Sequence, residues 1–238
     1  DLDMSAERLD NSADGILAST LGSIRLALAS LFDNRGGTTQ ARQDIDLSTA
    51  ANGQVRNAGG HLSAVAGNAR IQTGTFDNQG GGLYAGNLLD LDADSFANQG
   101  AAAGQGGKVS ARTVDFSLAG ALNNVHGLIE AGDALRLGVA SLDNRQGALR
   151  ALGQSGESRL TTSGTLDNRG GRLEVANANL ALNLGSLLNA GGSILHVGSG
   201  NFGLASSTLV EAGGTLVTGG ALSINATTWN HSGTLQAR

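Results

Sequence analysis

The sequence has no cysteine and no proline among its 238 residues, and aromatic residues make up only 3% of it. Without cysteine the chain cannot form a disulfide scaffold, a thiolate zinc site or a cysteine nucleophile. No run of about 18 apolar residues is present, which excludes a membrane-spanning helix. The net charge of −5 argues against a nucleic-acid partner, because binding to phosphates requires a basic surface.

Glycine is abundant, with 38 residues, and charged residues make up 15% of the chain. Apolar residues still account for 40%, so the chain can bury a core, and that core must consist of small and aliphatic side chains. Residues Asp1 to Met4 lack a basic stretch followed by an apolar segment. We therefore expect no signal peptide there, although a secreted precursor could contain this segment.

Internal repeats run along the chain, marked by phrases such as LDNRGG, FDNQGG and FDNRGG. Each phrase contains an asparagine that serves as a reference position. The reference positions are Asn11, Asn34, Asn57, Asn78, Asn98, Asn124, Asn144, Asn168, Asn189, Glu211 and Asn230. They are separated by 19 to 26 residues, with a mean of about 22.

Other columns keep the same spacing. Two positions before the reference, an apolar residue stands in ten of eleven copies, including Leu209, and Thr228 is the exception. Glycine stands three positions after the reference in nine copies, and isoleucine or leucine five positions after it in nine, including Ile16. Because independent columns agree over the whole chain, the array is continuous.

Within each repeat, apolar and other residues alternate with a period of two, as in 173–175 and 135–137. This alternation predicts strands, and a third short strand leads into each reference position. Copies of this size cannot bury a face alone, so each repeat must wind into one coil that pairs with the next. We predict an all-β fold, a right-handed parallel β-helix of about 11 coils of ~22 residues with three short strands per coil. A propeller would need blades of about 40 residues, and a sandwich fits the short repeat no better.

This architecture accounts for the composition. Proline is excluded because nearly every strand lies inside a hydrogen-bonded ladder. Glycine should supply positive φ at recurring corners, and alanine should fit a narrow bore. The reference asparagines should stack as a structural ladder of amides, with Glu211 as its weakest position because a charge would repel its neighbours.

The phrase Leu166 to Leu173, LDNRGGRL, and the upstream ALRL at 134–137 resemble the filamentous haemagglutinin repeat of large bacterial exoproteins. That family includes adhesins and the toxin-carrying effectors of contact-dependent growth inhibition. The resemblance covers the full 238 residues, so residues 1–238 are interpreted as a single β-helical repeat segment, an excerpt of a larger protein.

The resemblance implies a secreted protein at the bacterial cell surface, exported through an outer-membrane two-partner-secretion transporter. It further implies a filament that carries adhesive or toxic regions, with any target-cell receptor or glycan contacted through other regions. Neither a secretion domain at the start nor a toxin domain at the end is recognisable, so the segment resembles a stretch of the shaft. The lack of cysteine is compatible with threading an unfolded chain.

Aspartates directly before the reference positions are the first candidates for chemistry, since a retaining glycosidase uses two carboxyls about 5 Å apart. They are Asp10, Asp33, Asp77, Asp143 and Asp167. Their repetition in many coils, with arginines nearby, favours a structural role in solvated turns. We therefore predict no catalytic residue and no enzyme.

Four histidines, His61, His126, His196 and His231, lie in separate repeats without metal-ligand spacing. His196 falls in a column usually held by alanine, which would direct it inward, but we favour a locally shifted corner that places His196 at a turn. The glycine-rich stretch 101–107 and the segment 152–156 are interpreted as loops rather than phosphate or nucleophile sites. We therefore predict no metal and no cofactor.

Tyr84 and Trp229 are the aromatic residues that could serve a sugar site, while Phe32, Phe76 and Phe96 occupy the inward column. For Trp229 an outward strand position and an interface with a further coil both remain open.

Two main functional hypotheses follow. The first is a structural shaft that projects an adhesive or toxin-delivering region toward other cells. The alternative is a β-helical polysaccharide-processing enzyme or glycan-binding module, and weak glycan or receptor binding along the shaft is a third. Both ends of the segment resemble interior coils without caps, which predicts end-to-end self-association.

Overall fold

A computed structural model describes residues 1–238, including every side chain except that of Leu209. The described chain contains 23 strands and no helix. The strands are β1 (Leu2–Asp10), β2 (Ile16–Ser19), β3 (Ile24–Asp33), β4 (Thr38–Ala41), β5 (Ile45–Ser48), β6 (Gln54–Arg56), β7 (His61–Ala64), β8 (Ala69–Asp77), β9 (Gly82–Ala97), β10 (Lys108–Leu118), β11 (Ala121–Asn123), β12 (Leu128–Val139), β13 (Ser141–Asp143), β14 (Ala148–Ala151), β15 (Glu157–Asp167), β16 (Arg172–Val175), β17 (Asn179–Leu188), β18 (Ser193–His196), β19 (Asn201–Ala212), β20 (Thr215–Thr218), β21 (Ala221–Ala226), β22 (Trp229–His231) and β23 (Thr234–Gln236).

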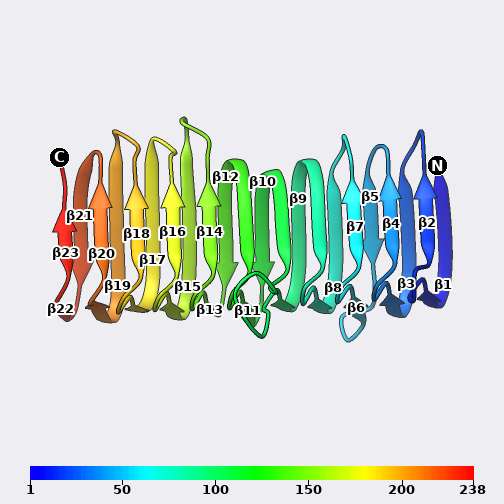
Figure 1. The fold of residues 1–238 in the computed structure, drawn as a ribbon, viewed down its shortest axis with the longest axis horizontal. Coiled ribbons are helices and arrows are strands. Elements are labelled where there is room, and N and C mark those ends of the chain that lie inside the picture. Colours follow the sequence, from blue (N-terminus) through cyan, green and yellow to red (C-terminus); the bar gives the residue numbers. More distant parts are fainter.

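Each coil pairs in parallel with the coils before and after it. The register sets Ile24 of β3 opposite Ile45 of β5 and Leu149 of β14 opposite Leu173 of β16, so equivalent residues lie 21 and 24 positions apart there. About 11 turns, spaced ~22 residues apart, follow one another along the long axis of the molecule (Figure 1). The predicted β-solenoid is therefore confirmed. At a rise of ~4.8 Å per coil the stack is roughly 50 Å long.

The 23 strands are hydrogen-bonded into one continuous sheet, whose parallel pairings form three walls of the solenoid. These walls are called sheets A, B and C below. Sheet A leads into the reference asparagines and includes β6, β11, β13 and β22. Sheet B follows the turn and includes β2, β4, β7, β14, β16, β18, β20 and β23. Sheet C includes β5 and β21. Longer strands continue around a corner, and β9 contributes to all three sheets. The stretch 101–107 forms a loop between β9 and β10, and 152–156 forms a loop between β14 and β15, as the sequence predicts.

Small and aliphatic side chains fill the bore. The apolar column of sheet B, such as Leu62 and Leu149, is fully buried, and so is the inward alanine column, with Ala64 at 0% exposure. Phenylalanines stack where sheets A and C bring them together: Phe96 meets Phe76 at 5.2 Å and Phe116 at 5.3 Å between ring centroids, edge to face. The predicted inward column of Phe32, Phe76 and Phe96 is confirmed.

Two column assignments from the sequence are wrong by one residue. In the first turn an extra residue with positive φ lets Leu17, not Ile16, enter the core column, and Ile16 is 76% exposed. Near the other end Val210, rather than Leu209, pairs with Leu187. The side chain of Leu209 lies outside the part that the structure describes.

Trp229 pairs with Val210 in the last coil and packs, partly buried, against the core. The repeat spacing predicts Thr228 at this position, two residues before the reference asparagine. An outward position for Trp229 is therefore wrong, because its register directs it inward. No helix in the described part of the chain is long and apolar enough to cross a membrane.

Candidate functional site

A buried row of asparagines runs along the solenoid at the corner between sheets A and B. Each Nδ2 donates to the Oδ1 of the next asparagine at 2.7–2.8 Å. The row, called the asparagine ladder below, consists of Asn11, Asn34, Asn57, Asn78, Asn98, Asn124, Asn144, Asn168 and Asn189. From Asn34 onward every member is at most 1% exposed.

From Asn34 onward, the second amide hydrogen of each ladder residue is donated to a backbone carbonyl of its own turn. Asn124, for example, also donates to the carbonyl of Gly127 at 3.3 Å and to that of Ala148 in the next coil at 3.2 Å. The backbone amide of Gly127 in turn donates to the carbonyl of Asn124 at 3.0 Å, which closes a β-turn. The asparagines from Asn34 onward thus bind their own turn and the next coil together, whereas Asn11 donates only to the next coil.

Glycine recurs three residues after the asparagine because of close contact, not because of its φ. A Cβ at Gly171 would lie 2.1 Å from the carbonyl oxygen of Asn144 in the preceding coil. Positive φ occurs one position earlier, at Gly170 with +64° and at His126 and Gln146 with +58° and +55°. The expectation that glycine supplies positive φ at recurring corners is therefore confirmed at this earlier position, where Gly36, Gly59, Gly80, Gly170 and Gly191 have positive φ. The glycine three residues after the asparagine is present for a different reason, because the coils approach within contact distance there.

The ladder stops at Asn189. The next coil places Glu211 opposite Leu188, so buried Ala212 takes the following position. Asn230 lies opposite Glu211 and is exposed. Its assignment to the ladder is wrong, as is that of Glu211, because the reference column shifts by one residue in this coil.

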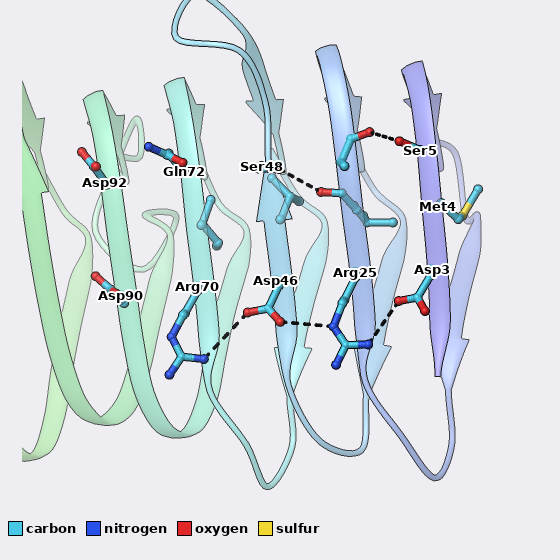
Figure 2. A pocket seen from close by; sticks show the side chains of 14 residues that line it. Asp3, Met4, Ser5, Arg25, Asp46, Ser48, Arg70, Gln72, Asp90 and Asp92 are labelled. Atoms are coloured by element: carbon cyan, nitrogen blue, oxygen red, sulfur yellow. Dashed lines mark hydrogen bonds and ion pairs between the residues drawn. The ribbon is translucent and has the colours of Figure 1, made fainter.

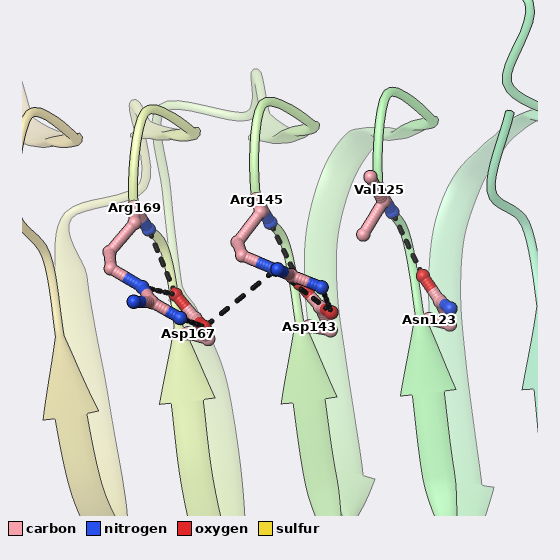
Figure 3. Close-up of polar contacts among 6 residues, drawn as sticks. All are labelled: Asn123, Val125, Asp143, Arg145, Asp167 and Arg169. Carbon is pink, nitrogen blue, oxygen red and sulfur yellow. Dashed lines mark hydrogen bonds and ion pairs between the residues drawn. The ribbon is translucent and has the colours of Figure 1, made fainter. Parts of the chain in front are cut away.

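The aspartate row beside the ladder caps the same turns. Asp143 and Asp167 each accept a hydrogen bond from the backbone amide two residues later, at 3.1 and 3.2 Å, and each pairs with the arginine at that position (Figure 3). Asn123, one coil earlier, accepts the same backbone bond from Val125 at 3.1 Å. The amide does this as well as the carboxylate does, so the recurring function of the row is to cap the turn.

The electrostatics of this row oppose general acid catalysis. Hydrogen bonds from the Arg35 side chain hold the pKa of Asp33 below its usual value, and the pKa of Asp10 is lowered by hydrogen bonds from Ser12. For Asp167, burial raises the pKa, but hydrogen bonds from Arg169 outweigh it and the net shift is downward. A glycosidase acid needs a raised pKa.

His196 departs from the sequence-based expectation. It is not at a turn but in β18, with 0% exposure and its ring directed into the bore. Nδ1 lies 2.8 Å from the hydroxyl of Thr218, and Nε2 lies 2.9 Å from the carbonyl oxygen of Asn177. The Asn177 amide accepts from Ser158 at 2.6 Å, so a second buried polar chain crosses four coils. The sequence signal that could have located it is the replacement of alanine by histidine and then threonine in an inward column.

The other histidines do not assemble. His61 contacts the ring of Tyr84 at 4.9 Å between centroids, His231 contacts Trp229 at 6.1 Å, and His126 occupies a turn. Burial lowers the pKa of His61. Among the described residues, no group of three or more histidine, aspartate or glutamate side chains could hold a metal ion.

A shallow groove of about 750 Å³ crosses the outer face of sheet C over β1, β3, β5, β8 and β9. Arg25 lies between Asp3 and Asp46, at 3.3 and 3.7 Å, and Arg70 approaches Asp46 at 3.8 Å (Figure 2). These exposed pairs alternate in sign and neutralise one another, so each contributes little stability. The hydroxyls of Ser5 and Ser48, which line the groove, donate to backbone carbonyls at 3.4 and 3.5 Å.

Comparison with known proteins matches this sequence to one repeat type. A family model described as "Haemagglutinin repeat" matches residues 1–65, 64–124, 98–170, 175–226 and 197–238. The chain is 33% identical over 194 residues to a protein of Dickeya dadantii (strain 3937) named Deoxyribonuclease CdiA. That alignment covers 81% of this chain and 5% of the relative, so the chain spans a small part of the relative's length. No solved structure matches the chain.

Proposed function

The chain belongs to the haemagglutinin-repeat family, and from this premise we propose that it is part of the rigid shaft of a secreted filament at the bacterial cell surface. The observation that carries the proposal is the unbroken stack: parallel pairing and the hydrophobic core continue from the first coil to the last. A rod of this kind holds its two ends at a fixed separation, which is what a spacer must do.

In this proposal residues 1–238 are one repeat segment of a larger protein whose other regions adhere to target cells or deliver a toxin. The similarity to a much longer relative supports this, and the nuclease activity in that relative's name would belong to other regions of such a protein. Export would use an outer-membrane two-partner-secretion transporter. Any receptor or glycan would be bound mainly outside this segment.

We further propose that the segment is not an enzyme. The paired carboxylates of Asp143 and Asp167 share Arg145, with Nε of Arg145 at 3.8 Å from Oδ2 of Asp167. Both carboxylates also accept a hydrogen bond from a backbone amide of their turn, so each is bound both by arginine and by the backbone. Incubation of the segment with uronates and cell-surface glycans should give no turnover. Turnover abolished by Asp143→Asn or Asp167→Asn would establish the enzyme alternative.

The shaft function is tested by deleting coils from this segment, or by replacing the segment, within the larger exoprotein. Deletion of whole coils should shorten the filament in electron micrographs by about 5 Å per coil. Replacement of residues 1–238 by an unrelated β-solenoid of equal length should restore adhesion or toxin delivery. If only the native sequence restores the function, the segment is a binding module and the shaft proposal fails.

Glycan binding is the second candidate, and the contact between Tyr84 and His61 on the outer face of sheet B favours it. The Tyr84 ring lies against Gly82, where a Cβ would be 2.6 Å from its Cε2 atom. The ring therefore lies close to the sheet, and an aromatic face of this kind suits a sugar ring. A glycan array with the segment and its Tyr84→Ala variant tests it: binding that disappears in the variant supports this candidate, and no binding rejects it.

A further inference from the structure

A row of outward charges runs along sheet C, with one residue from each of eight successive coils. In register, the row consists of Asp3, Arg25, Asp46, Arg70, Asp90, Asp115, Arg136 and Arg159. The first four charges alternate in sign, and the last four do not: two negative charges are followed by two positive ones. The row then continues with Ala181 and Gly203, which are uncharged.

The alternating half is neutralised within the molecule, and the other half is not. Arg25 and Arg70 form ion pairs with their aspartate neighbours (Figure 2). Asp90, Asp115 and Arg136 make no hydrogen bond or ion pair within the described residues, while Arg159 bridges only to Glu157, at 2.6 Å. Like charges directly opposite each other in a sheet are unfavourable, and this row contains two such pairs side by side. Burial and the charge of Asp115 raise the pKa of Asp90, which records the same repulsion.

We propose that this part of sheet C, called the charge-block face, is an interface with a second copy of the same chain. The copies pack face to face and antiparallel, about a two-fold axis that runs along the strands between β10 and β12. The axis reverses the order of the coils and keeps each row opposite itself. Asp90 then faces Arg159 of the second copy and Asp115 faces its Arg136, and symmetry repeats both contacts.

The rest of the face is compatible with this packing. Arg70 meets the position of Ala181 and Asp46 that of Gly203, so no like charges are opposed. The neighbouring outward row carries the small residues Ser117, Gly138 and Thr161, which permit close approach. Asp90, Asp115 and Arg136, which are unpaired in one molecule, are thus paired in two, and Arg159 gains Asp90 as a partner beside Glu157. The contact closes as a dimer because the same patch is used twice.

This inference goes beyond the shaft function, because it concerns contact between the sides of two shafts. Sedimentation equilibrium of the 238-residue chain should show a dimer at low ionic strength whose dissociation constant rises at least about tenfold between roughly 0.05 and 0.5 M salt. End-to-end stacking would instead give open-ended chains of increasing size.

Two charge-reversal variants make the test specific. The variant D90R/D115R has only positive charges in the block, and R136E/R159E has only negative ones, so each alone should be monomeric. Mixed in equal amounts they should form a heterodimer. The variant E7R/E211R changes the net charge by the same amount as D90R/D115R at two exposed positions outside the block, and should dimerise like the parent.

Circular dichroism establishes that each variant retains its β-structure before the comparison is made. The proposal is overturned if the parent is monomeric at low salt, if either reversal variant dimerises like the parent, or if the mixture of the two stays monomeric.

Discussion

Replacement of Asn124 by aspartate tests the ladder with the smallest change of shape. The Asn124 side chain is fully buried and donates to Asn144 Oδ1 at 2.7 Å, while its own Oδ1 accepts from Asn98 at 2.8 Å. In the Asn124→Asp variant at neutral pH, a carboxylate oxygen faces the Asn144 oxygen, so two acceptors meet without a proton. Three donated hydrogen bonds are lost, each worth about 0.5–1.5 kcal/mol, and a buried acceptor is left unpaired at about 1–3 kcal/mol. We expect a loss of about 2.5–7.5 kcal/mol at pH 7.

Protonation should restore the bond, because a neutral carboxyl can donate to Asn144. Burial raises the folded-state pKa of the new carboxyl above its unfolded value of about 3.9. The variant should therefore be most stable below about pH 4, where only the bonds to the Gly127 and Ala148 carbonyls stay lost. It should lose about 1.4 kcal/mol more per pH unit as the pH rises toward the folded pKa. Asn123→Asp is the matched control: its slot holds Asp143 one coil later, so a change within about 0.5 kcal/mol is expected.

The assay is denaturant unfolding followed by far-ultraviolet circular dichroism at several pH values, with the Asn123→Asp curve subtracted at each. Because repeat arrays can unfold in segments, native-state hydrogen exchange in the coils around Asn98 and Asn144 gives a local measurement. If Asn124→Asp is as stable as the control at pH 7, or if its deficit does not change with pH, the ladder does not stabilise the coils in the way argued.

Three further predictions use the same unfolding measurements. Gly171→Ala should strongly lower the free energy of unfolding, because its Cβ would lie 2.1 Å from the Asn144 carbonyl oxygen. Gly170→Asn should lower it by less than about 1 kcal/mol, since non-glycine residues adopt this φ in other turns. Equal losses in the two variants would contradict this explanation. Asp33→Asn should lose up to about 1 kcal/mol of stability above pH 4, because the lowered pKa of Asp33 stabilises the fold there. The variant should match the parent once the pH falls below the folded pKa of Asp33. A difference that persists in acid would refute the ion-pair explanation. Phe96→Ala should cost about 3–5 kcal/mol by opening a cavity in the edge-to-face stack, and a loss under about 1 kcal/mol would show that the bore collapses around it.

The sequence predicts the solenoid well because its signal is repeated: the LDNRGG phrase marks a turn, and eleven copies reveal the coil length. It predicts less well which residue of a coil occupies a given inward position where the length of a turn differs by one residue. The extra residue in the first turn moved Leu17 into the core, and neither Ile16 nor Leu17 is distinguished by hydropathy. Near residue 210 two adjacent apolar residues, Leu209 and Val210, satisfy the same pattern, so the shift that removes Asn230 from the ladder could not be read from the sequence.

Interactions between coils explain the other differences. The close approach at Gly171 depends on a carbonyl that is 27 residues away in sequence, so the sequence suggests glycine without giving the reason. The buried position of His196 depends on partners in two other coils, Asn177 and Thr218, none of which forms a known motif. The charge block of sheet C likewise becomes visible only when the register of four coils is known.

The asparagine ladder also gives the rod an electrical direction. All eight hydrogen bonds between the asparagine side chains point the same way, with each nitrogen donating toward the C-terminal side. The dipoles of the side-chain amides therefore add instead of cancelling. Aligned amide dipoles polarise one another, as in other hydrogen-bonded chains. A coil added in reverse orientation would place donor against donor at the C-terminal side, or acceptor against acceptor at the N-terminal side. Asparagine coils therefore extend the ladder only head to tail, and each completed coil presents the donor or acceptor that the next one needs.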